Sequence, residues 1–387
     1  MKRFTLLTLL GLSLNSFAQF SSGSDGSDGE LTVGSDTSVT LQVPEDGIFN
    51  FTSVTVGFRG NVFFTPNAAN TPIYILSTGD ISLTGRIYVN APDNNRIQAG
   101  LGGPGGFAGG PGGPNPGDGL GPGGGKGGTE SSGSAFRGGG SFASQAPSTA
   151  TTTTRGSIYG NPLLVPLVGG SGGGGATSGV GGAGGGGAIC LASDTRIFLN
   201  WNNSWAVPLF DASGGTSASN TGVGSGGAIR LVAPDVSGIA RFDIQPGNTT
   251  YGGYGRIRVD SLNPSQFGIN SVGSSSTYMT QGSNMVVFPS NQPTIRVTEA
   301  AGSTVDPART DPLFVLLPVG TGSDQDITVE VTDFGTVVPL RVTVTPEQGA
   351  KATFDFTIDN TAGGTSSGTT TVQIPAGTQT RVDVWTR

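Results

Sequence analysis

Residues 169–189 read GGSGGGGATSGVGGAGGGGAI, and this glycine run decides what kind of fold the chain can adopt. The chain has 69 glycines in 387 residues, more than twice the average usage of about 7%. They crowd between Gly100 and Gly187. Glycine supplies backbone freedom and close approach, with no side chain for catalysis or recognition. The sequence therefore predicts an architecture rather than a specific activity.

Part of this glycine block, residues 100–187, repeats every three residues. Residues 102–107 read GGPGGF and, after a slip at Ala108, residues 109–114 read GGPGGP. Triplets of this kind favour a polyproline-II-type helix, and such helices can pair through N–H···O and Cα–H···O bonds. Collagen is excluded because its Gly-X-Y register never slips. The alternative for residues 100–140 is a flexible loop, and the pattern alone leaves both open.

Short strands flank the block and share one pattern. Each segment has a short aliphatic strand, a turn of about five small or polar residues, and a second strand. The segments comprise residues 73–75 with 81–89, residues 189–191 with 197–199, and residues 229–231 with 236–244. Earlier alternation over residues 31–64 also predicts β-strands. Repeats of this size suit a β-solenoid, and a β-sandwich is the alternative.

Three further features lie in or beside the block. Residues 141–154, rich in Ser, Ala and Thr, predict an exposed loop. Residues 163–168, LLVPLV, predict an apolar plug that packs under the glycine-rich sheets. Cys190, the only cysteine, lies between Ile189 and Leu191, which favours a small buried hydrophobe over a reactive thiol.

The last part of the chain differs in composition and hydrophobic pattern. Glycine thins out, and seven short alternating strands are expected at residues 294–297, 314–317, 327–331, 340–344, 354–358, 371–374 and 382–385. This number and rhythm are typical of an immunoglobulin-like or fibronectin-type sandwich, here without a disulfide. We therefore expect an all-β protein with a signal peptide at residues 1–18, a glycine-rich module at 19–290 and a sandwich at 291–387.

The first residues predict export. Lys2 and Arg3 precede an apolar stretch over residues 4–14, and residues 16–18 form a small-x-small site before Gln19. The stretch is shorter than the roughly 20 residues of a membrane span, so we expect cleavage near Ala18-Gln19, secretion or surface location, and no integral membrane segment in the mature chain.

The net charge of the chain limits the classes of partner that it is expected to bind. The net charge is −7 from 19 basic and 26 acidic residues, and removal of Lys2 and Arg3 leaves 17 − 26 = −9. Nucleic acid requires clustered basic residues, so it is not expected as a partner. We expect an unknown surface or matrix partner, with a glycan as one possibility.

Few residues could carry chemistry. The chain has no histidine, which excludes Ser-His-Asp and Cys-His catalysis, and we expect no cofactor. The catalytic candidates are turn carboxylates, because a solenoid can stack acids of successive coils: Asp80, Asp194 and Asp235, with Asp93 and Asp260 close by. Asp also favours turns for local hydrogen bonding alone. Trp201 and Trp205 could stack on a sugar or cap a sheet edge. Asp25 and Asp28, in the polar leader over residues 21–29, offer weak oxygen ligands for calcium, against a simple flexible leader.

Four motifs together resemble a group of uncharacterised exported glycine-rich bacterial proteins. They are the leader over residues 23–29, residues 78–87 (TGDISLTGRI), residues 224–231 (GSGGAIRL) and residues 252–260. The resemblance implies export and no agreed activity. The Gly-Gly-x runs also look like the polyglycine-helix bundles of the snow flea antifreeze protein and of the glycine-rich domain of anaplastic lymphoma kinase-type receptors.

The sequence leads us to expect one of three functions. The first is a secreted structural or adhesive protein without catalytic activity. The second is a carbohydrate-binding or carbohydrate-active protein that uses the turn carboxylates. Ice binding is a third.

Overall fold

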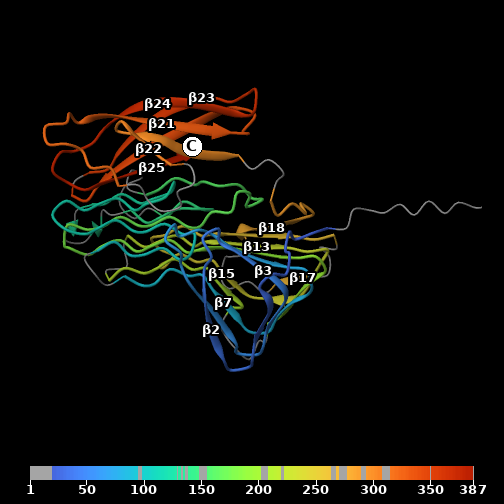
Figure 1. The fold of residues 1–387 in the computed structure, drawn as a ribbon. Helices are drawn as coiled ribbons and strands as arrows, with labels where there is room; N and C mark the ends of the chain where they lie inside the picture. The colour runs from blue at the N-terminus through green and yellow to red at the C-terminus, as the bar shows by residue number, and fades with distance from the viewer. Residues whose placement is uncertain are drawn as a thin grey trace, which may run out of the picture.

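The fold is that of an all-β protein, seen here in a computed structural model (Figure 1). The structure describes residues 20–94, 98–128, 130–131, 134–135, 138–147, 155–201, 208–218, 222–262, 267–269, 277–288, 293–306, 314–348 and 350–386. Within these ranges there is no α-helix, as the sequence predicts. The predicted signal peptide at residues 1–18 and the indole of Trp205 lie outside them.

Two curled parallel sheets build the larger part of the molecule. The first has eleven strands: β1 (Gly29–Val33), β3 (Ile48–Val56), β5 (Ile73–Ser77), β6 (Ile81–Leu83), β10 (Ala188–Ser193), β11 (Arg196–Asn200), β13 (Ala228–Val232), β14 (Asp235–Ala240), β16 (Arg256–Asp260), β17 (Phe267–Ile269) and β18 (Met279–Gly282). The second has five: β2 (Ser38–Gln42), β4 (Asn61–Thr65), β7 (Arg86–Tyr88), β12 (Phe210–Asp211) and β15 (Phe242–Asp243).

The strand register aligns the three segments that share a sequence pattern. Ile73 of β5 pairs with Ile189 of β10, which pairs with Ile229 of β13. The second strands pair likewise, β6 with β11 and β11 with β14. The long strand β3 joins the two rows, because its first half pairs with β5 and its second half with β6. Each segment therefore lies on the previous one, and the predicted repeat is confirmed.

Alternation decides which side chains fill the core between these sheets. Every second residue of each strand points inward, and the inward set is aliphatic or aromatic: Val54, Ile81, Ile197, Phe210 and Phe242 are at most 1% exposed. Stacking like residues on like residues at the strand spacing of about 4.8 Å gives a continuous core. The hydrophobic period of two therefore specifies this part of the fold.

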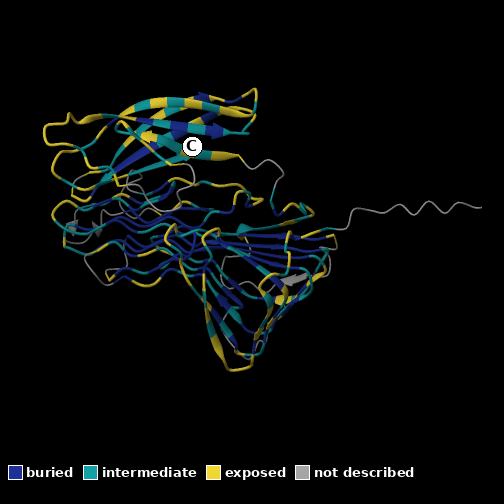
Figure 2. Ribbon diagram, viewed as in Figure 1, coloured by how far each residue is buried: buried dark blue, intermediate teal, exposed yellow. Residues whose placement is uncertain are grey.

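The described glycine block is packed rather than loose. The central glycine segment, residues 169–176, donates hydrogen bonds with a period of three. Gly170 and Gly173 donate to the carbonyls of Gly186 and Ala183, and Gly172 and Gly175 donate to those of Leu120 and Gly117. Residues 170–176 are all buried, and Figure 2 shows buried backbone running through the block.

Six neighbouring segments surround this central one. Besides residues 183–186 and 117–120, it donates to the carbonyl of Gly138 and accepts from residues 107–113, from residues 125–128 and from Ser225. Backbone groups rather than side chains hold these segments together, so the glycines are ordered although they form no regular strand. One short pair, β8 (Glu130–Ser131) with β9 (Ser134–Ala135), lies at the edge of the block.

Close approach explains why the central segment needs glycine. A Cβ on Gly173 would lie 2.1 Å from the carbonyl oxygen of Gly222. On Gly174 it would lie 2.1 Å from the oxygen of Lys126. Real Cβ atoms do not approach backbone oxygen this closely, and the packed interior has no room to yield.

The outer side of the β5–β10–β13 row is covered by the predicted plug. Leu164 and Leu167 are buried against Cys190 and Val232, whereas Leu163 is 40% exposed. Cys190 is fully buried, as expected, and burial raises the pKa of its thiol to about 11. The thiol is therefore inert at neutral pH.

The predicted exposed loop at residues 141–154 is wrong for its described part. Ser141, Phe142 and Ala146 are completely buried. The ring of Phe142 stacks on Tyr159 with centroids 4.7 Å apart, and the Ser141 hydroxyl donates to the carbonyl of Gly156 at 2.8 Å. The packing of the Phe142 ring thus buries a segment whose polar composition predicts an exposed loop.

Two antiparallel sheets form the C-terminal part. One contains β19 (Thr294–Ala300), β20 (Ser303–Thr304), β21 (Asp324–Thr332) and β24 (Thr365–Gln373), in the order β20-β19-β21-β24. The other contains β22 (Val337–Pro346), β23 (Ala352–Asp359) and β25 (Thr380–Thr386), in the order β23-β22-β25. Their inward residues, such as Val329 and Leu340, form a separate core.

Six of the seven strands expected here are present, and the one at residues 314–317 is not. Phe314 is 76% and Leu316 95% exposed, so their alternation buries nothing. This part lies over the glycine block in Figure 1, where Trp385 meets Phe107 edge to face with centroids 5.0 Å apart.

Replacing Gly173 by alanine tests the packing of the block. We expect Gly173→Ala to lower the free energy of unfolding by about 3 kcal/mol or more, because a methyl group has no space beside the Gly222 oxygen. The matched control is Gly322→Ala, where a Cβ meets nothing within 4 Å and a change within about 0.5 kcal/mol is expected. Denaturant unfolding measures both, and equal midpoints for the two variants would contradict the packing.

Candidate functional site

The three turn carboxylates singled out from the sequence do not converge. The register places Asp235 beside Arg196, and Asp80 directly precedes Ile81, the partner of Ile197. Arg196, rather than Asp194, thus occupies the position between the two acids. Its guanidinium binds the Asp80 carboxylate at 2.5 Å, with both side chains nearly half exposed, a pair worth at most about 1 kcal/mol.

Asp194 lies elsewhere in the turn. Its carboxylate accepts a hydrogen bond from the backbone amide of Ser22 at 2.5 Å and so holds the leader in place. The Ser22 hydroxyl is buried and donates to the carbonyl of Ser77. The leader is therefore docked on the sheet instead of being flexible.

The remaining candidates also have local partners. The Asp25 carboxylate accepts from Ser27, whose side chain and backbone hold the pKa of Asp25 below its usual value, and the Asp28 carboxylate accepts from the amide of Asn50 at 2.6 Å. Trp201 packs at the edge of the core, with the guanidinium of Arg241 at 5.6 Å from its ring centroid. No group of three or more His, Cys, Asp or Glu residues in the described chain could hold a metal ion.

Asp260 belongs to a buried ion cluster. Its carboxylate is fully buried and binds Arg258 at 2.5 Å and Arg230 at 3.4 Å. Arg230 also donates to the carbonyl of Val286 at 2.7 Å. These contacts tie the segment before residue 289 to β13 and β16, which is a structural role.

A polar hollow of about 340 Å³ lies at one end of the five-stranded sheet. The side chains that line it come from the chain directly after β7, β12 and β15, together with Asp243 of β15 itself: Asn90, Asp93, Ser213, Thr216, Asp243 and Gln245. Backbone pairing continues past the strands here, since Val89 and Ala91 donate to the carbonyls of Asp211 and Ser213. The hollow is therefore built on ordered backbone.

One outward row of side chains leads to this hollow. Phe63 of β4 and Tyr88 of β7 each follow the paired residues Val62 and Ile87. Tyr88 is in register with Asp211 of β12, and Asp211 with Asp243 of β15. The inward neighbours Ile87, Phe210 and Phe242 are buried, so the row faces outward. The rings of Phe63 and Tyr88 stack with centroids 4.7 Å apart. We call Phe63, Tyr88, Asp211 and Asp243 the outer row.

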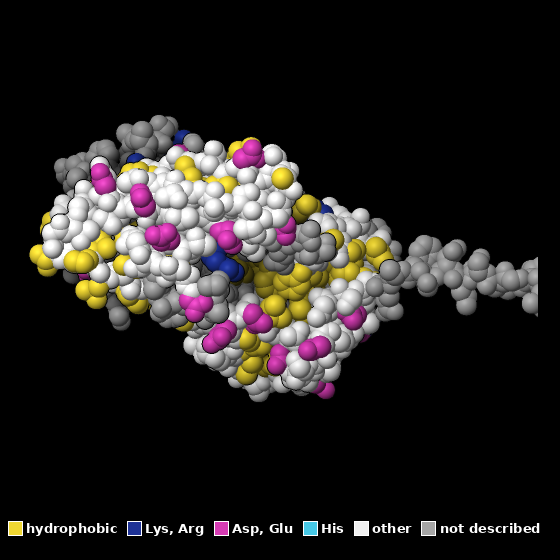
Figure 3. All heavy atoms as spheres, turned by 45° about the horizontal axis from the view of Figure 1, so that its top comes forward, with side chains coloured by type: hydrophobic (Ala, Val, Ile, Leu, Met, Phe, Trp, Pro, Cys, Tyr) yellow, Lys and Arg dark blue, Asp and Glu magenta, His cyan; other side chains and the backbone are white. Residues whose placement is uncertain are grey.

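The carboxylates around the hollow differ in environment. Asp93 accepts from the amide and the hydroxyl of Thr216 at 3.0 and 2.6 Å, and Asp211 accepts from Ser213. Burial, and secondarily the neighbouring Asp211, raises the pKa of Asp243 above its usual value. Figure 3 shows the protein's acidic bias on one face, where magenta groups outnumber the blue ones.

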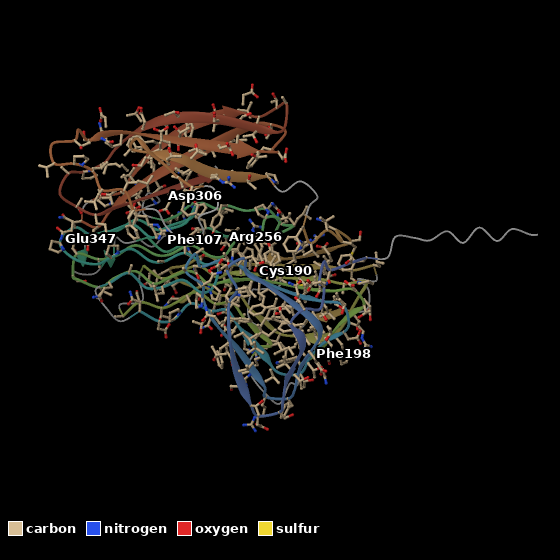
Figure 4. The ribbon with its side chains drawn as sticks, in the orientation of Figure 1. Phe107, Cys190, Phe198, Arg256, Asp306 and Glu347 are labelled. Carbon is tan, nitrogen blue, oxygen red and sulfur yellow. The ribbon has the colours of Figure 1, made fainter. Side chains whose placement is uncertain are left out.

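The sequence analysis did not identify the outer row, although it noted Asp93 of the hollow. A signal exists in the three segments IYVN (residues 87–90), FDAS (210–213) and FDIQ (242–245), in which large apolar residues alternate with outward polar ones. The strands are two or three residues long, too short for periodicity alone to identify. Figure 4 shows two groups outside this site within the body of the molecule, the buried Cys190 and the partly buried Arg256.

Comparison of the chain with protein-family models, with curated proteins and with solved structures gave no match. The resemblance to exported glycine-rich proteins thus stays a prediction. Among the described residues, no helix is long and apolar enough to cross a membrane.

The shifted pKa of Asp243 gives a pH-dependent prediction. A carboxyl whose pKa is raised in the folded state destabilises the fold as pH rises through the interval above its unfolded value of about 3.9. Asp243→Asn should therefore be more stable than the parent at pH 7, and the difference should vanish at lower pH, where the Asp243 carboxyl of the parent becomes neutral.

Asp25→Asn is the control of opposite sign, because the pKa of Asp25 is lowered and its charged form favours folding. Thermal midpoints between pH 3 and 8 measure both variants. The same pH trend for Asp243→Asn and Asp25→Asn would overturn the assignment.

Proposed function

We propose that this protein is a secreted structural or adhesive protein of the cell surface or matrix, without catalytic activity. The observation that carries the proposal is the central glycine segment with its six neighbours. A bundle held by backbone groups offers rigidity and almost no side chains for chemistry. Such an element suits a scaffold more than an enzyme.

The finer architecture supports the same proposal. The three-residue hydrogen-bond period is that of a polyglycine-II bundle. The in-register parallel rows suit a β-solenoid, in which each coil buries the face of its neighbour. The strand orders β19-β21-β24 and β23-β22-β25 suit an immunoglobulin-like or fibronectin-type sandwich, a frequent module of surface proteins. A rigid body would then present a sandwich to a partner.

Carbohydrate binding is the second proposal, and the polar hollow beside two stacked aromatic rings is what favours it. From sequence alone, the candidates for this function are Asp80, Asp194 and Asp235 with Trp201 or Trp205. The ion pair of Asp80 and the backbone contact of Asp194 engage two of those carboxylates in local contacts. The hollow is a better starting point.

Export is the part of the proposal that is tested most simply. The full chain, expressed in a bacterium with a general secretion pathway, should appear outside the cytoplasm with Gln19 as its first residue, because the signal is cleaved after Ala18. N-terminal sequencing of each cell fraction measures this. A variant with Leu9→Arg and Leu10→Arg, which interrupts the apolar stretch, should stay uncleaved in the cytoplasm. Cytoplasmic retention of the parent chain with Met1 or Lys2 intact would contradict the proposal.

A further inference from the structure

We propose that the outer row and the polar hollow form a binding site for an uncharged polysaccharide chain. The inference rests on the proposed adhesive function and names the class of partner. It uses residues of the five-stranded sheet, which lie apart from the turn carboxylates Asp80 and Asp235 of the other sheet.

The backbone makes this face a regular grid. Outward positions repeat along three paired segments, as Tyr88 and Asn90, Asp211 and Ser213, and Asp243 and Gln245. From β4 to β15 the outer row crosses three strand intervals of about 4.8 Å each, or about 14 Å. This is an extended track rather than a point, which suits a linear polymer better than a compact small molecule.

The lining chemistry selects a polyhydroxylated ligand. Carboxylates and amide oxygens accept hydrogen bonds from hydroxyl groups, and the amides of Asn90 and Gln245 can also donate. The hydroxyls of Ser213 and Thr216 donate to Asp211 and Asp93 and can accept from a ligand. Among the described residues that line the hollow, no bulky aliphatic side chain would anchor an apolar ligand. Several convergent polar groups of both kinds fix the orientation of a ligand in such a site.

The aromatic pair supplies the apolar part that a sugar ring needs. Phe63 is 39% exposed, and Tyr88 lies between Phe63 on one side and Asp211 on the other. The C–H face of a pyranose can pack on an aromatic surface while its hydroxyls reach neighbouring polar groups. Arg86 donates to the Tyr88 hydroxyl at 2.8 Å and so restricts that ring.

Charge disfavours acidic sugars in the hollow, while the Arg86 guanidinium lies at the Tyr88 end of the site. Asp93 and Asp243 line the hollow, Asp211 lies directly beside them, and the described lining residues include neither Lys nor Arg. A uronate or sulfated chain would place like charges at close range. The expected ligand is therefore a neutral glycan, recognised by its hydroxyls.

Affinity electrophoresis of the full chain tests the site. The gels contain hydroxyethyl cellulose, xylan, galactomannan or laminarin as neutral polymers, polygalacturonate as the acidic one, and EDTA throughout. We expect retardation by at least one neutral polymer and none by polygalacturonate. Tyr88→Ala and Phe63→Ala should weaken binding about tenfold or more, equivalent to about 1.4 kcal/mol.

Phe198→Ala is the matched control. Phe198 is 38% exposed, nearly the same as Phe63, but lies on β11 of the other sheet, so its loss should leave retardation unchanged. Thermal unfolding of each variant shows that the fold is kept. No retardation by any neutral polymer, binding of polygalacturonate alone, or equal weakening in Phe63→Ala and Phe198→Ala would each overturn the inference. If the chain is exported and cleaved but binds none of these polymers, this inference fails while the proposed function stands.

Discussion

The hydrogen bonds between glycine backbones are the constraint on which the rest of the structure depends. The central glycine segment contacts six others, and five of those lie within the block itself, of which residues 183–186 continue directly into β10. Because these contacts leave no room for a Cβ, the segments reach a density that ordinary side chains would prevent. Each glycine loses much conformational entropy on folding, and the dense hydrogen bonding offsets that loss.

This constraint also sets the position of the other parts. The glycine block leads from β7 to β10, so its folding brings the second repeat segment onto the first. On its other side, Phe107 meets Trp385 of the C-terminal sheets. Lys351 shows that the C-terminal sheets lie close to the glycine block. Burial lowers the pKa of Lys351, and the negative charge of Asp118, in the glycine block, is near enough to raise it. A chain with a loose glycine block would lose both the stacking of the second repeat segment on the first and the contact with the C-terminal sheets.

The sequence predicts this fold well wherever a side-chain period exists. The alternation around Ile73, Ile189 and Ile229 predicts strands that the register then pairs with each other. It fails where composition misleads. Phe142 buries a Ser-rich segment. Periodicity fails once, at residues 314–317, which alternate as a strand does although Phe314 and Leu316 stay exposed. Glycine itself has no side-chain pattern, so order and disorder in the block look alike until the hydrogen bonds are seen.

The candidate site could be predicted only in part for a related reason. Asp80, Asp194 and Asp235 share a turn setting in sequence, yet Asp194 lies two residues before Arg196, and Arg196 is the residue in register with Asp235. The outer row depends on the pairing of strands as short as Phe210–Asp211 and Phe242–Asp243, which a hydrophobic period cannot identify. Register across the sheet, rather than spacing along the chain, brings these groups together.

Amide hydrogen exchange in the central glycine segment tests the account most directly. If the six surrounding segments hold this backbone, the amides of Gly172, Gly173, Gly174 and Gly175 exchange as slowly as those of the buried strand β10. Exchange of these four amides at the rate of an unfolded chain, while β10 remains protected, would contradict the claim that glycine backbone contacts hold the molecule together.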